Sequence, residues 1–405
     1  MKKKVLALLL VFVMAAALLT GCGGEPAGST PDVQPGASDP TENTALNKSF
    51  PAEKIKIGVE VYDTTDLTVI GYSEYFKYLE EYFNIEFIIS ESISSAEEEL
   101  AFIESCHAAG CVGYIGGYNA GMATCVEKVT EYGMYYWGCE RGLDEQFADN
   151  EYYLGGFSAY ASEGVDPSKG GDYALGYAMA KTLADQGASH VVYCSGGSSM
   201  GIPMFVDRLA GFRDGIAAAQ AIGSAIQWDE EHDTIEGWPG TDDFAAAQAN
   251  AISKDYDAVA CSFSGFEIWA QPLIDADKVG SVKIAGVGSV SDSLIDLFDS
   301  GMISLIIYEV PEICFAQAVP MIVNAATGHA DVIKGDEGYM DCKVNRWLIT
   351  SAEEYNAIYK FHEEQGGYYV TAEDMANLMV ELNPDLTRDD FLGYFGSLTM
   401  DACVK

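Results

Sequence analysis

The feature that most constrains the fold is an alternation of short, β-branched apolar runs with helix-length segments. It starts with an apolar run over 55–61, a helical stretch over 71–83 and a second apolar run over 85–89. Strands separated by helix-length segments predict βαβ units, in which neighbouring strands are parallel. Because a parallel sheet is buried on both faces, helices are expected to cover both sides. The alternation therefore predicts an α/β protein.

The alternation runs through the chain twice. The first round continues with a Ser-x-x-Glu helix start at Ser95, a strand over 112–115, a helix over 123–132 and a strand over 134–137. The second round begins after 162–164 and contains helix 174–186, strand 191–194, helix 205–219, strand 225–228, helix 244–253, strand 258–262, helix 267–275 and strand 282–287. Two doubly wound lobes of similar size are predicted, as expected for a chain of 405 residues.

A C-terminal extension follows the two rounds. The segments Ser351-Ala-Glu-Glu354 and Thr371-Ala-Glu-Asp374 each place a hydroxyl residue three positions before a carboxylate. Such pairs cap the first turn of a helix, because both side chains reach free backbone amides. Residues 351–405 are therefore predicted to form a helical extension.

The charge balance excludes nucleic acid as a partner. The chain has 62 Asp and Glu residues against 22 Lys and Arg, and its formal charge is -40. Phosphate binding needs Lys and Arg to replace condensed counterions, so such an acidic protein is repelled by DNA, RNA and anionic lipid. With 49% hydrophobic residues, most of the chain has enough apolar material to fold.

The N-terminus predicts export and a lipid anchor. Three lysines precede an apolar run over 5–19, which is typical of a signal-peptide core and short for a membrane span. The run ends in Leu19-Thr-Gly-Cys22, which resembles a bacterial lipobox, whereas an ordinary signal peptide is expected to end in an Ala-x-Ala arrangement. We expect a signal peptide over 1–21, lipidation of Cys22, and a flexible tether over 22–53 that is rich in Gly, Pro, Ser and Thr. The protein would then be extracytoplasmic and anchored to the cell membrane.

The cysteines predict buried thiols rather than a metal site. Once Cys22 carries lipid, nine cysteines remain, so at least one is a free thiol in a monomer. Cys139 and Cys194 follow apolar runs, where a cysteine behaves as a small buried hydrophobic residue. No CxxC pair occurs, which argues against a zinc ribbon.

Catalytic motifs are scarce, and no cofactor or metal is predicted. The chain has no GxxxxGK[ST], HExxH or EF-hand pattern. The segment 197–201 fits GxSxG and would make Ser199 a nucleophile with His232, His329 or His362 as its base, but the pattern is short and a Gly-Ser turn at a strand end, where such sheets bind ligands without reacting with them, is the favoured interpretation. The segment 228–233 is either a cation site or a solvated acidic loop. The sequence therefore favours a binding protein over an enzyme.

Several short segments between residues 55 and 350 follow one another in a characteristic order. They are Ile57-Gly-Val-Glu-Val-Tyr62, Glu140-Arg141, Ala161-Ser-Glu-Gly164, Gly211-Phe212, Ile284-Ala-Gly-Val-Gly-Ser289 and Tyr308-Glu-Val-Pro-Glu312. In this order and spacing the chain resembles the sugar-binding type I group of ABC-importer substrate-binding proteins, typified by ribose-binding protein. The resemblance implies two lobes joined by a hinge of three crossovers, near 161–165, 286–291 and 342–347.

The resemblance also implies the lobe boundaries and the site. The first lobe would contain 54–162 plus 290–344, with helix 294–298, strand 303–308 and helix 313–326 returning to it, and the second lobe 163–289 plus 345–350. Ligand-facing residues would lie at strand ends: Tyr62, Asp66, Asn119, Glu140, Arg141, Ser199, Phe263, Phe266, Ser289 and Glu309. Arginine offers a planar fork of donors, carboxylates accept hydroxyl protons and aromatic rings stack on apolar ring faces.

Some of these residues have alternative roles. Glu140 and Arg141 would also fit a surface ion pair. Phe263, Phe266 and Trp269 would also fit the hydrophobic core. Glu309 would also fit a cap for the following helix. The second lobe departs from the family, because an apolar position near Val206 replaces an arginine, Phe263-Ser-Gly-Phe266 replaces an Asn-Asp pair and Ser289 replaces a hinge aspartate. These departures disfavour a pentose and favour a more aromatic, less hydroxylated or cationic ligand.

We therefore expect an extracytoplasmic substrate-binding lipoprotein that captures a small molecule, a sugar or related compound, and delivers it to the permease of an ABC importer. It is expected to act as a monomer with a membrane anchor at Cys22. The alternatives are a ligand sensor for a membrane kinase or chemoreceptor, a nucleoside-binding lipoprotein, and a secreted serine hydrolase built on Ser199.

Overall fold

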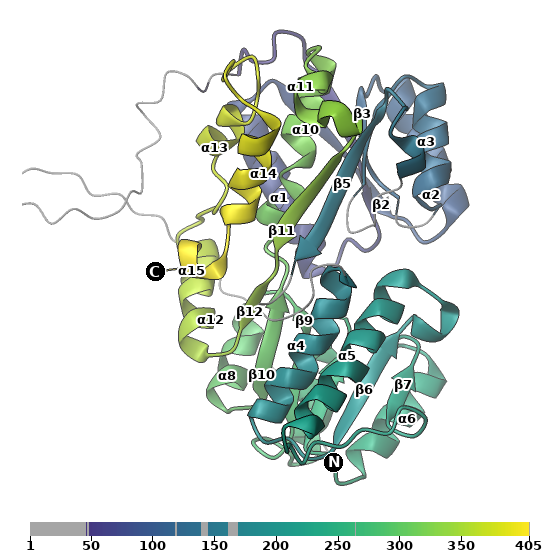
Figure 1. Ribbon diagram of the computed structural model, residues 1–405, viewed down its shortest axis with the longest axis vertical. Coiled ribbons are helices and arrows are strands. Elements are labelled where there is room, and N and C mark those ends of the chain that lie inside the picture. Colours follow the sequence, from purple (N-terminus) through teal and green to yellow (C-terminus); the bar gives the residue numbers. More distant parts are fainter. Residues whose placement is uncertain are drawn as a thin grey trace, which may run out of the picture. The chain divides into compact units, whose positions relative to one another are not determined.

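The computed structural model describes residues 46, 48–117, 120–138, 145–160, 169–263 and 265–404. These residues contain two six-stranded sheets, each covered by helices, and a set of C-terminal helices (Figure 1). We call each sheet with the helices that cover it a lobe. The predicted fold class is confirmed, because both sheets are dominated by parallel strands and the C-terminal extension is helical.

The first sheet has the strand order β11-β5-β4-β3-β1-β2, and all its pairs are parallel. Its strands are β1 (Ile55–Val61), β2 (Ile85–Ser92), β3 (Gly113–Gly116), β4 (Tyr135–Gly138), β5 (Tyr153–Tyr160) and β11 (Met340–Asn345). Helices α2 (Ala96–Ala108) and α3 (Met122–Glu131) contribute buried residues to one hydrophobic cluster of this lobe. Helices α1 (Leu67–Tyr82), α9 (Pro311–Phe315), α10 (Ala318–Ala326) and α11 (Ala330–Lys334) contribute theirs to a second cluster.

The second sheet has the order β12-β10-β9-β8-β6-β7, in which only the β10–β12 pair is antiparallel among the described strands. Its strands are β6 (Val191–Gly196), β7 (Thr234–Glu236), β8 (Ala258–Cys261), β9 (Lys283–Gly288), β10 (Ile303–Tyr308) and β12 (Trp347–Ile349). Its helices are α4 (Gly171–Asp185), α5 (Pro203–Ala221), α6 (Asp242–Ile252), α7 (Phe266–Asp275) and α8 (Ile295–Asp299).

Helices α4 and α5 pack unusually close together because glycines line their contact. A Cβ atom added at Gly176 would lie 1.8 Å from the carbonyl oxygen of Arg208, and one added at Gly211 would lie 1.8 Å from that of Tyr173. Since any side chain there would collide with backbone, the two glycines set the distance between the helices. Arg208 is thereby held in a buried position, where its side chain pairs with Asp172 of α4.

The chain passes between the sheets at different places from those expected. Strand β10 was predicted in the first lobe, but it pairs with β9 and β12 in the second sheet, so the prediction was wrong for 303–308. The passage expected at 286–291 therefore lies between β10 and α9, at Glu309 and Val310. The passage expected at 342–347 is confirmed, since β11 and β12 flank Arg346. The remaining passage lies between β5 and α4, and the expected range 161–165 falls outside the described residues.

Two local predictions also differ from the structure. The strand expected over 225–228 is reduced to one bridge between His190 and Gln227, and β7 forms instead at 234–236. The side chain of Asp233 accepts a hydrogen bond from the Asp229 amide at 2.9 Å and another from the Tyr256 hydroxyl at 2.6 Å. These bonds hold the acidic loop at 228–233 in a turn, so the chain enters the sheet only after the turn, as strand β7.

The cysteines are mostly buried thiols, as predicted for Cys194. Eight of them lie among the described residues, none of the eight forms a disulfide, and all but Cys403 are buried. Cys22 and Cys139 fall outside the described residues. In the part of the chain that the structure describes, no helix is long and apolar enough to cross a membrane.

Candidate functional site

The carboxyl ends of the parallel strands are where open α/β sheets bind ligands, because helix N-termini and short loops gather there. In this chain those ends are followed by the loops after β1, β6, β8, β9 and β10. Most of the predicted site residues that the structure describes lie in these loops. Asn119, Glu140 and Arg141 fall outside the described residues, so their roles stay predictions.

After β1, Tyr62 and Asp66 lie together in one loop. The Asp66 carboxylate caps α1, accepting from the Thr68 amide at 2.8 Å and the Val69 amide at 3.3 Å. Burial raises the pKa of Asp66, and the charge of Glu309 acts in the same direction, while bonds from backbone amides and the Tyr62 hydroxyl oppose it. Asp66 therefore caps α1 and is also close enough to Glu309, in the passage from β10 to α9, for the two negative charges to repel each other.

The two lobes touch through a hydroxyl pair. Ser289, which follows β9, hydrogen-bonds to Thr68 of α1 at 3.0 Å between the two side-chain oxygens. Ser289 is buried, with 9% of its surface exposed. In this structure its hydroxyl thus contacts the first lobe, which places the predicted site residue directly at the junction.

Glu309 lies in a buried cluster of four charged side chains. Its Oε1 atom is 2.5 Å from Nη2 of Arg346 and 3.9 Å from Nη2 of Arg208. The Oδ1 atom of Asp172 lies 2.9 Å from Nε of Arg208 and 3.2 Å from Nη1 of Arg346. Both guanidinium groups are almost fully buried, with 4% and 2% of the side chains exposed. Burying such charges requires pairing, which the cluster supplies.

The cluster joins the three passages of the chain between the lobes. Glu309 lies in the passage from β10 to α9, Arg346 lies between β11 and β12, and Asp172 lies in the first turn of α4, just after the passage from β5. Burial raises the pKa of Asp172, but the charges of Arg208 and Arg346 outweigh this and hold it below its ordinary value. Arg208 also donates to the carbonyl oxygen of Ser262 after β8, at 2.6 Å.

Sequence reasoning missed Arg208, Arg346 and Asp172, although a signal was present. Arg346 directly precedes the apolar strand β12, and Arg208 lies in α5 with apolar residues on either side of the Asp207-Arg208 pair. A charge in such a setting is rarely buried without a partner. Val206 stands where the resembled family has an arginine, but this chain has an arginine two positions later, at Arg208.

Aromatic side chains gather at the carboxyl end of the second sheet. The ring of Trp238, after β7, lies 5.1 Å from that of Phe205 at an edge-on angle and 5.5 Å from that of Phe263, measured between centroids. Trp238 is 37% exposed, and Met200 in the turn after β6 and Val206 in α5 are 60% and 41% exposed. The group is apolar and open on one side, which suits a ligand with an apolar face. Sequence reasoning named Phe263 but missed Trp238.

Two other aromatic candidates are packing residues. Phe266 and Trp269 are 0% and 1% exposed and belong to the hydrophobic core. Trp228, at the start of the acidic loop, packs edge-on against Phe212 with 5.1 Å between ring centroids. The burial of Phe266 and Trp269 agrees with the core role considered for them. Of the aromatic candidates in the second lobe, Phe263 remains at the open edge, where it is half-buried.

Ser199 lies exposed in the 3₁₀ turn Ser198–Met200 after β6. Among the described residues, which include all five histidines, no histidine hydrogen-bonds to Ser199. Instead, His232 pairs with Asp229 at 3.1 Å and His362 with Glu312 at 3.6 Å. The arrangement gives Ser199 no base and fits a strand-end turn. The acidic loop at 228–233 is likewise folded on itself, and no group of three or more metal-ligating side chains occurs in the described part of the chain.

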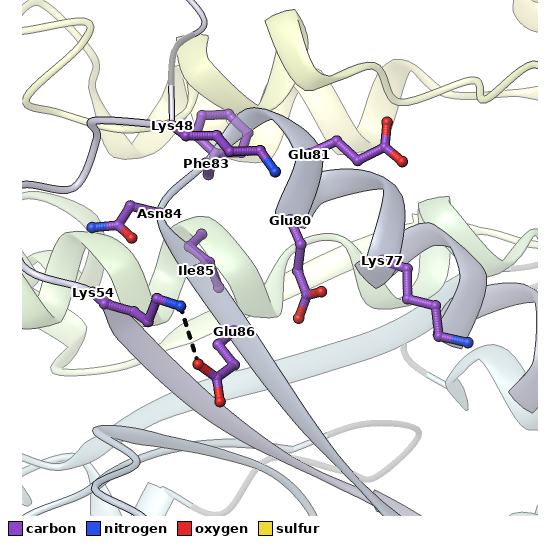
Figure 2. A pocket seen from close by; sticks show the side chains of 9 residues that line it. All are labelled: Lys48, Lys54, Lys77, Glu80, Glu81, Phe83, Asn84, Ile85 and Glu86. Atoms are coloured by element: carbon purple, nitrogen blue, oxygen red, sulfur yellow. Dashed lines mark hydrogen bonds and ion pairs between the residues drawn. The ribbon is translucent and has the colours of Figure 1, made fainter.

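A separate pocket of about 380 Å³ lies away from these loops (Figure 2). It is formed where α1 ends and β2 begins, at the amino ends of the first sheet's strands. Its lining alternates in charge, and Figure 2 shows Lys54 paired with Glu86 at 3.2 Å. Open α/β sheets bind ligands at the opposite edge, so this pocket is not part of the candidate site.

Comparison with known proteins supports the fold and leaves the sequence relationship distant. No protein-family model matches the chain, and no curated protein matches it significantly. Solved structures do match. One is a periplasmic solute-binding protein of an ABC transporter from Actinobacillus succinogenes, solved with bound D-allose. It is 14% identical to this chain with a TM-score of 0.57, and the match covers 75% of this chain and 99% of that protein.

Two further structures agree. A solute-binding protein of an ABC transporter from Bacillus halodurans, with bound myo-inositol, is 16% identical with a TM-score of 0.55 and covers 76% of this chain and 98% of its own. The binding protein of the arabinose ABC transporter from Shewanella is 15% identical with a TM-score of 0.53 and covers 77% and 96%. The chain is thus similar in fold to sugar-type substrate-binding proteins of ABC transporters, as the resemblance in its sequence indicated.

Proposed function

We propose that this protein is an extracytoplasmic substrate-binding lipoprotein that captures a small molecule between two lobes and delivers it to the permease of an ABC importer. In this proposal residues 1–21 are a signal peptide, Cys22 carries lipid, and 22–53 tether the binding protein to the membrane as a monomer. The protein works as a binding protein without catalysis or cofactor.

One observation carries the proposal. The two doubly wound sheets are connected at a junction where Asp172, Glu309 and Arg346, which lie in or soon after the three passages of the chain, meet in one charged cluster. A junction of this kind lets two rigid lobes rotate about a few residues, which is how hinged binding proteins enclose a ligand. Proteins of the same fold were solved with D-allose and with myo-inositol.

The site residues point to a ligand that has both an apolar face and polar groups. The second lobe offers Trp238 and Phe263 for stacking, and the first lobe offers Asp66 beside Tyr62 as an acceptor. A pyranose, a cyclic polyol and a nucleoside each combine a stacking face with hydroxyl groups. We infer a sugar or related compound, with a nucleoside as the alternative. Asn119, Glu140 and Arg141 are proposed to complete the first-lobe side.

A thermal-shift screen of the chain from residue 23 onward tests the proposal. Sugars, polyols, nucleosides and amino acids are compared, since a ligand bound only by the folded protein raises its melting temperature. A saturable rise with one class, lost in Trp238→Ala and kept in Trp228→Phe, supports binding at the aromatic edge. Failure of every class, together with labelling of Ser199 by a fluorophosphonate, would overturn the binding proposal in favour of a hydrolase.

A second candidate is a sensor that presents its ligand-bound form to another membrane protein. It is favoured by one structural neighbour, solved as the XylFII-LytSN complex, which is 16% identical with a TM-score of 0.51 and is covered over 99% of its length. Crosslinking in intact cells with and without the screened ligand separates the two. Capture of an importer permease supports delivery, whereas capture of a kinase or chemoreceptor favours sensing.

A further inference from the structure

The C-terminal extension starts on the second lobe and ends on the first. It consists of α12 (Ala352–Tyr359), a π-helical turn at Lys360–Glu364, and the helices α13 (Ala372–Asn377), α14 (Arg388–Ser397) and α15 (Met400–Cys403). In Figure 1 its yellow-green and yellow helices run alongside α8, β12, β11 and α10. Because β12 belongs to the second sheet while α14 packs on β11 of the first, the chain crosses between the lobes once more.

The second-lobe anchor is Tyr355. Its hydroxyl accepts a hydrogen bond from the Ser291 amide at 2.7 Å and donates to the Ser291 carbonyl oxygen. Its ring lies 5.0 Å from that of Phe298 in α8, and the side chain is fully buried. Ser291 is two residues after Ser289, which contacts Thr68 of the first lobe. The anchor therefore holds the same loop that carries the contact between the lobes.

The first-lobe anchors lie in α1, α9 and α10. The buried Asn324 side chain donates to the Leu378 carbonyl oxygen at 2.9 Å and accepts from the Val380 amide at 2.8 Å. The Tyr78 hydroxyl accepts from the Ala372 amide at 3.0 Å, and Glu312 accepts from the Tyr369 amide at 3.0 Å. Two backbone bonds to one buried amide side chain fix both position and direction.

Between these anchors, the segment 360–371 lies over the passage at Arg346. The ring of Trp347 is 4.8 Å from that of Tyr369, and its Nε1 atom donates to the Leu398 carbonyl oxygen at 3.1 Å. The segment contains a π-helical turn, which is rare in α/β proteins, followed by Gly366 in the left-handed region with φ of 64°. The connection is short and folded, with both of its ends attached.

We propose that the C-terminal extension is a strap that limits rotation of the two lobes about their three passages. When the lobes rotate, the distance between the Tyr355 and Asn324 anchors changes, and the folded segment 360–371 must either unwind or release an anchor. The strap therefore favours the conformation in which Ser289 meets Thr68. The first three passages permit rotation, and the fourth connection sets its range.

The strap makes a prediction that a purely structural cover does not make. If the extension only covers apolar surface, lengthening the segment between its anchors leaves the lobes unaffected. If the extension is a strap, added length relieves the restraint even though every anchor is intact. A restraint of one or two hydrogen bonds corresponds to a change of about tenfold in the ratio of two conformations.

The test uses the ligand-free chain from residue 23 onward, so it is independent of the proposed function. Spin labels on non-natural residues at Glu127 of α3 and Ile222 after α5, both exposed, report the distance between the lobes by pulsed electron resonance. Three variants are compared with the parent: Tyr355→Phe, a Gly-Ser-Gly-Ser insertion between Gln365 and Gly366, and Tyr359→Phe as the matched control on the half-buried side of α12.

We expect Tyr355→Phe and the insertion each to broaden the distance distribution and raise the second population about tenfold, while Tyr359→Phe leaves it unchanged. Melting temperatures are recorded for each variant to establish that it is folded. Distributions for Tyr355→Phe and the insertion that superimpose on the parent would overturn the proposal. A broadening by Tyr355→Phe alone would also overturn it, because slack in an intact strap must act in the same direction.

Discussion

Removal of the Arg346 side chain tests whether the charged cluster holds the junction together. Arg346→Met keeps much of the side-chain volume but leaves Glu309 with Arg208 at 3.9 Å and Asp172 with Arg208 alone. Breaking a buried ion pair by removing one partner costs about 3–5 kcal/mol, because the other charge stays buried. Since 27% of the Asp172 side chain is exposed, water compensates for part of that loss.

We therefore expect a loss of about 3 kcal/mol, at the lower end of that range. A kilocalorie shifts the melting temperature of a cooperative unit of 150–250 residues by about 2–4 °C, so Arg346→Met should melt about 6–12 °C below the parent at pH 7. Differential scanning calorimetry measures the shift. The matched control is Arg213→Met, which removes the exposed Arg213–Glu230 pair and should cost less than about 1 kcal/mol.

The pH dependence has a defined sign. The pKa of Asp172 is lower in the folded protein than its ordinary value, so its contribution to stability is present above about pH 4 and is lost as the pH falls through the folded pKa. In Arg346→Met that pKa moves back towards the ordinary value. The difference in melting temperature between parent and variant should narrow as the pH falls below about 4 and through the folded pKa of Asp172. A difference below 1 °C at pH 7, or one that does not change at any acidic pH where both proteins stay folded, would refute this reasoning.

Three further predictions concern the junction, the packing and the site. Ser289→Ala removes the hydroxyl pair with Thr68 and should cost about 0.5–1.5 kcal/mol in urea unfolding; an unchanged midpoint would mean that this contact contributes nothing to the folded state. Gly176→Ala puts a methyl group 1.8 Å from the Arg208 carbonyl oxygen and should lower the melting temperature. Gly393→Ala, where nothing lies within 4 Å of the added methyl group, should instead raise the free energy of unfolding by about 0.5–1 kcal/mol. Equal effects in the two variants would contradict the proposed contact between α4 and α5. Trp238→Ala should weaken binding of the ligand found in the screen about tenfold or more by isothermal titration calorimetry, and an unchanged affinity would remove the aromatic edge from the site.

The fold was predictable from the sequence because its signals are local. The apolar run at β1, the Ser95 cap of α2 and the boxes at Ser351 and Thr371 all depend on residues a few positions apart. Strand β5 was not predicted, because its glycines break the β-branched pattern that identifies a strand. The lobe of β10 was also mispredicted, since an apolar run forms a strand in either sheet and only its pairing with β9 decides between them.

The site was less predictable because it depends on contacts between distant segments. Asp172, Glu309 and Arg346 lie far apart in the sequence, and their meeting follows from where the chain passes between the sheets. Phe263 and Phe266 look alike in sequence, yet one is half-buried beside Trp238 and the other is buried under Gly288. Two phenylalanines three positions apart at a strand end can have different surroundings, and the sequence alone does not tell which one is buried.

The arrangement of charges suggests how stability and motion are divided in this protein. In the four-residue cluster both arginines and Glu309 are buried, so the cluster fixes the passages of the chain relative to one another but carries a large cost if the pairs that hold these charges open. Lobe rotation that preserved these pairs would have to occur by small backbone changes on either side of the cluster, as hinges commonly do. The contacts outside the cluster are one hydrogen bond between Thr68 and Ser289 and two between Tyr355 and Ser291, and because none of these groups is charged they cost less to break. The cluster therefore acts as the fixed point, and the weaker contacts around it determine how far the lobes separate.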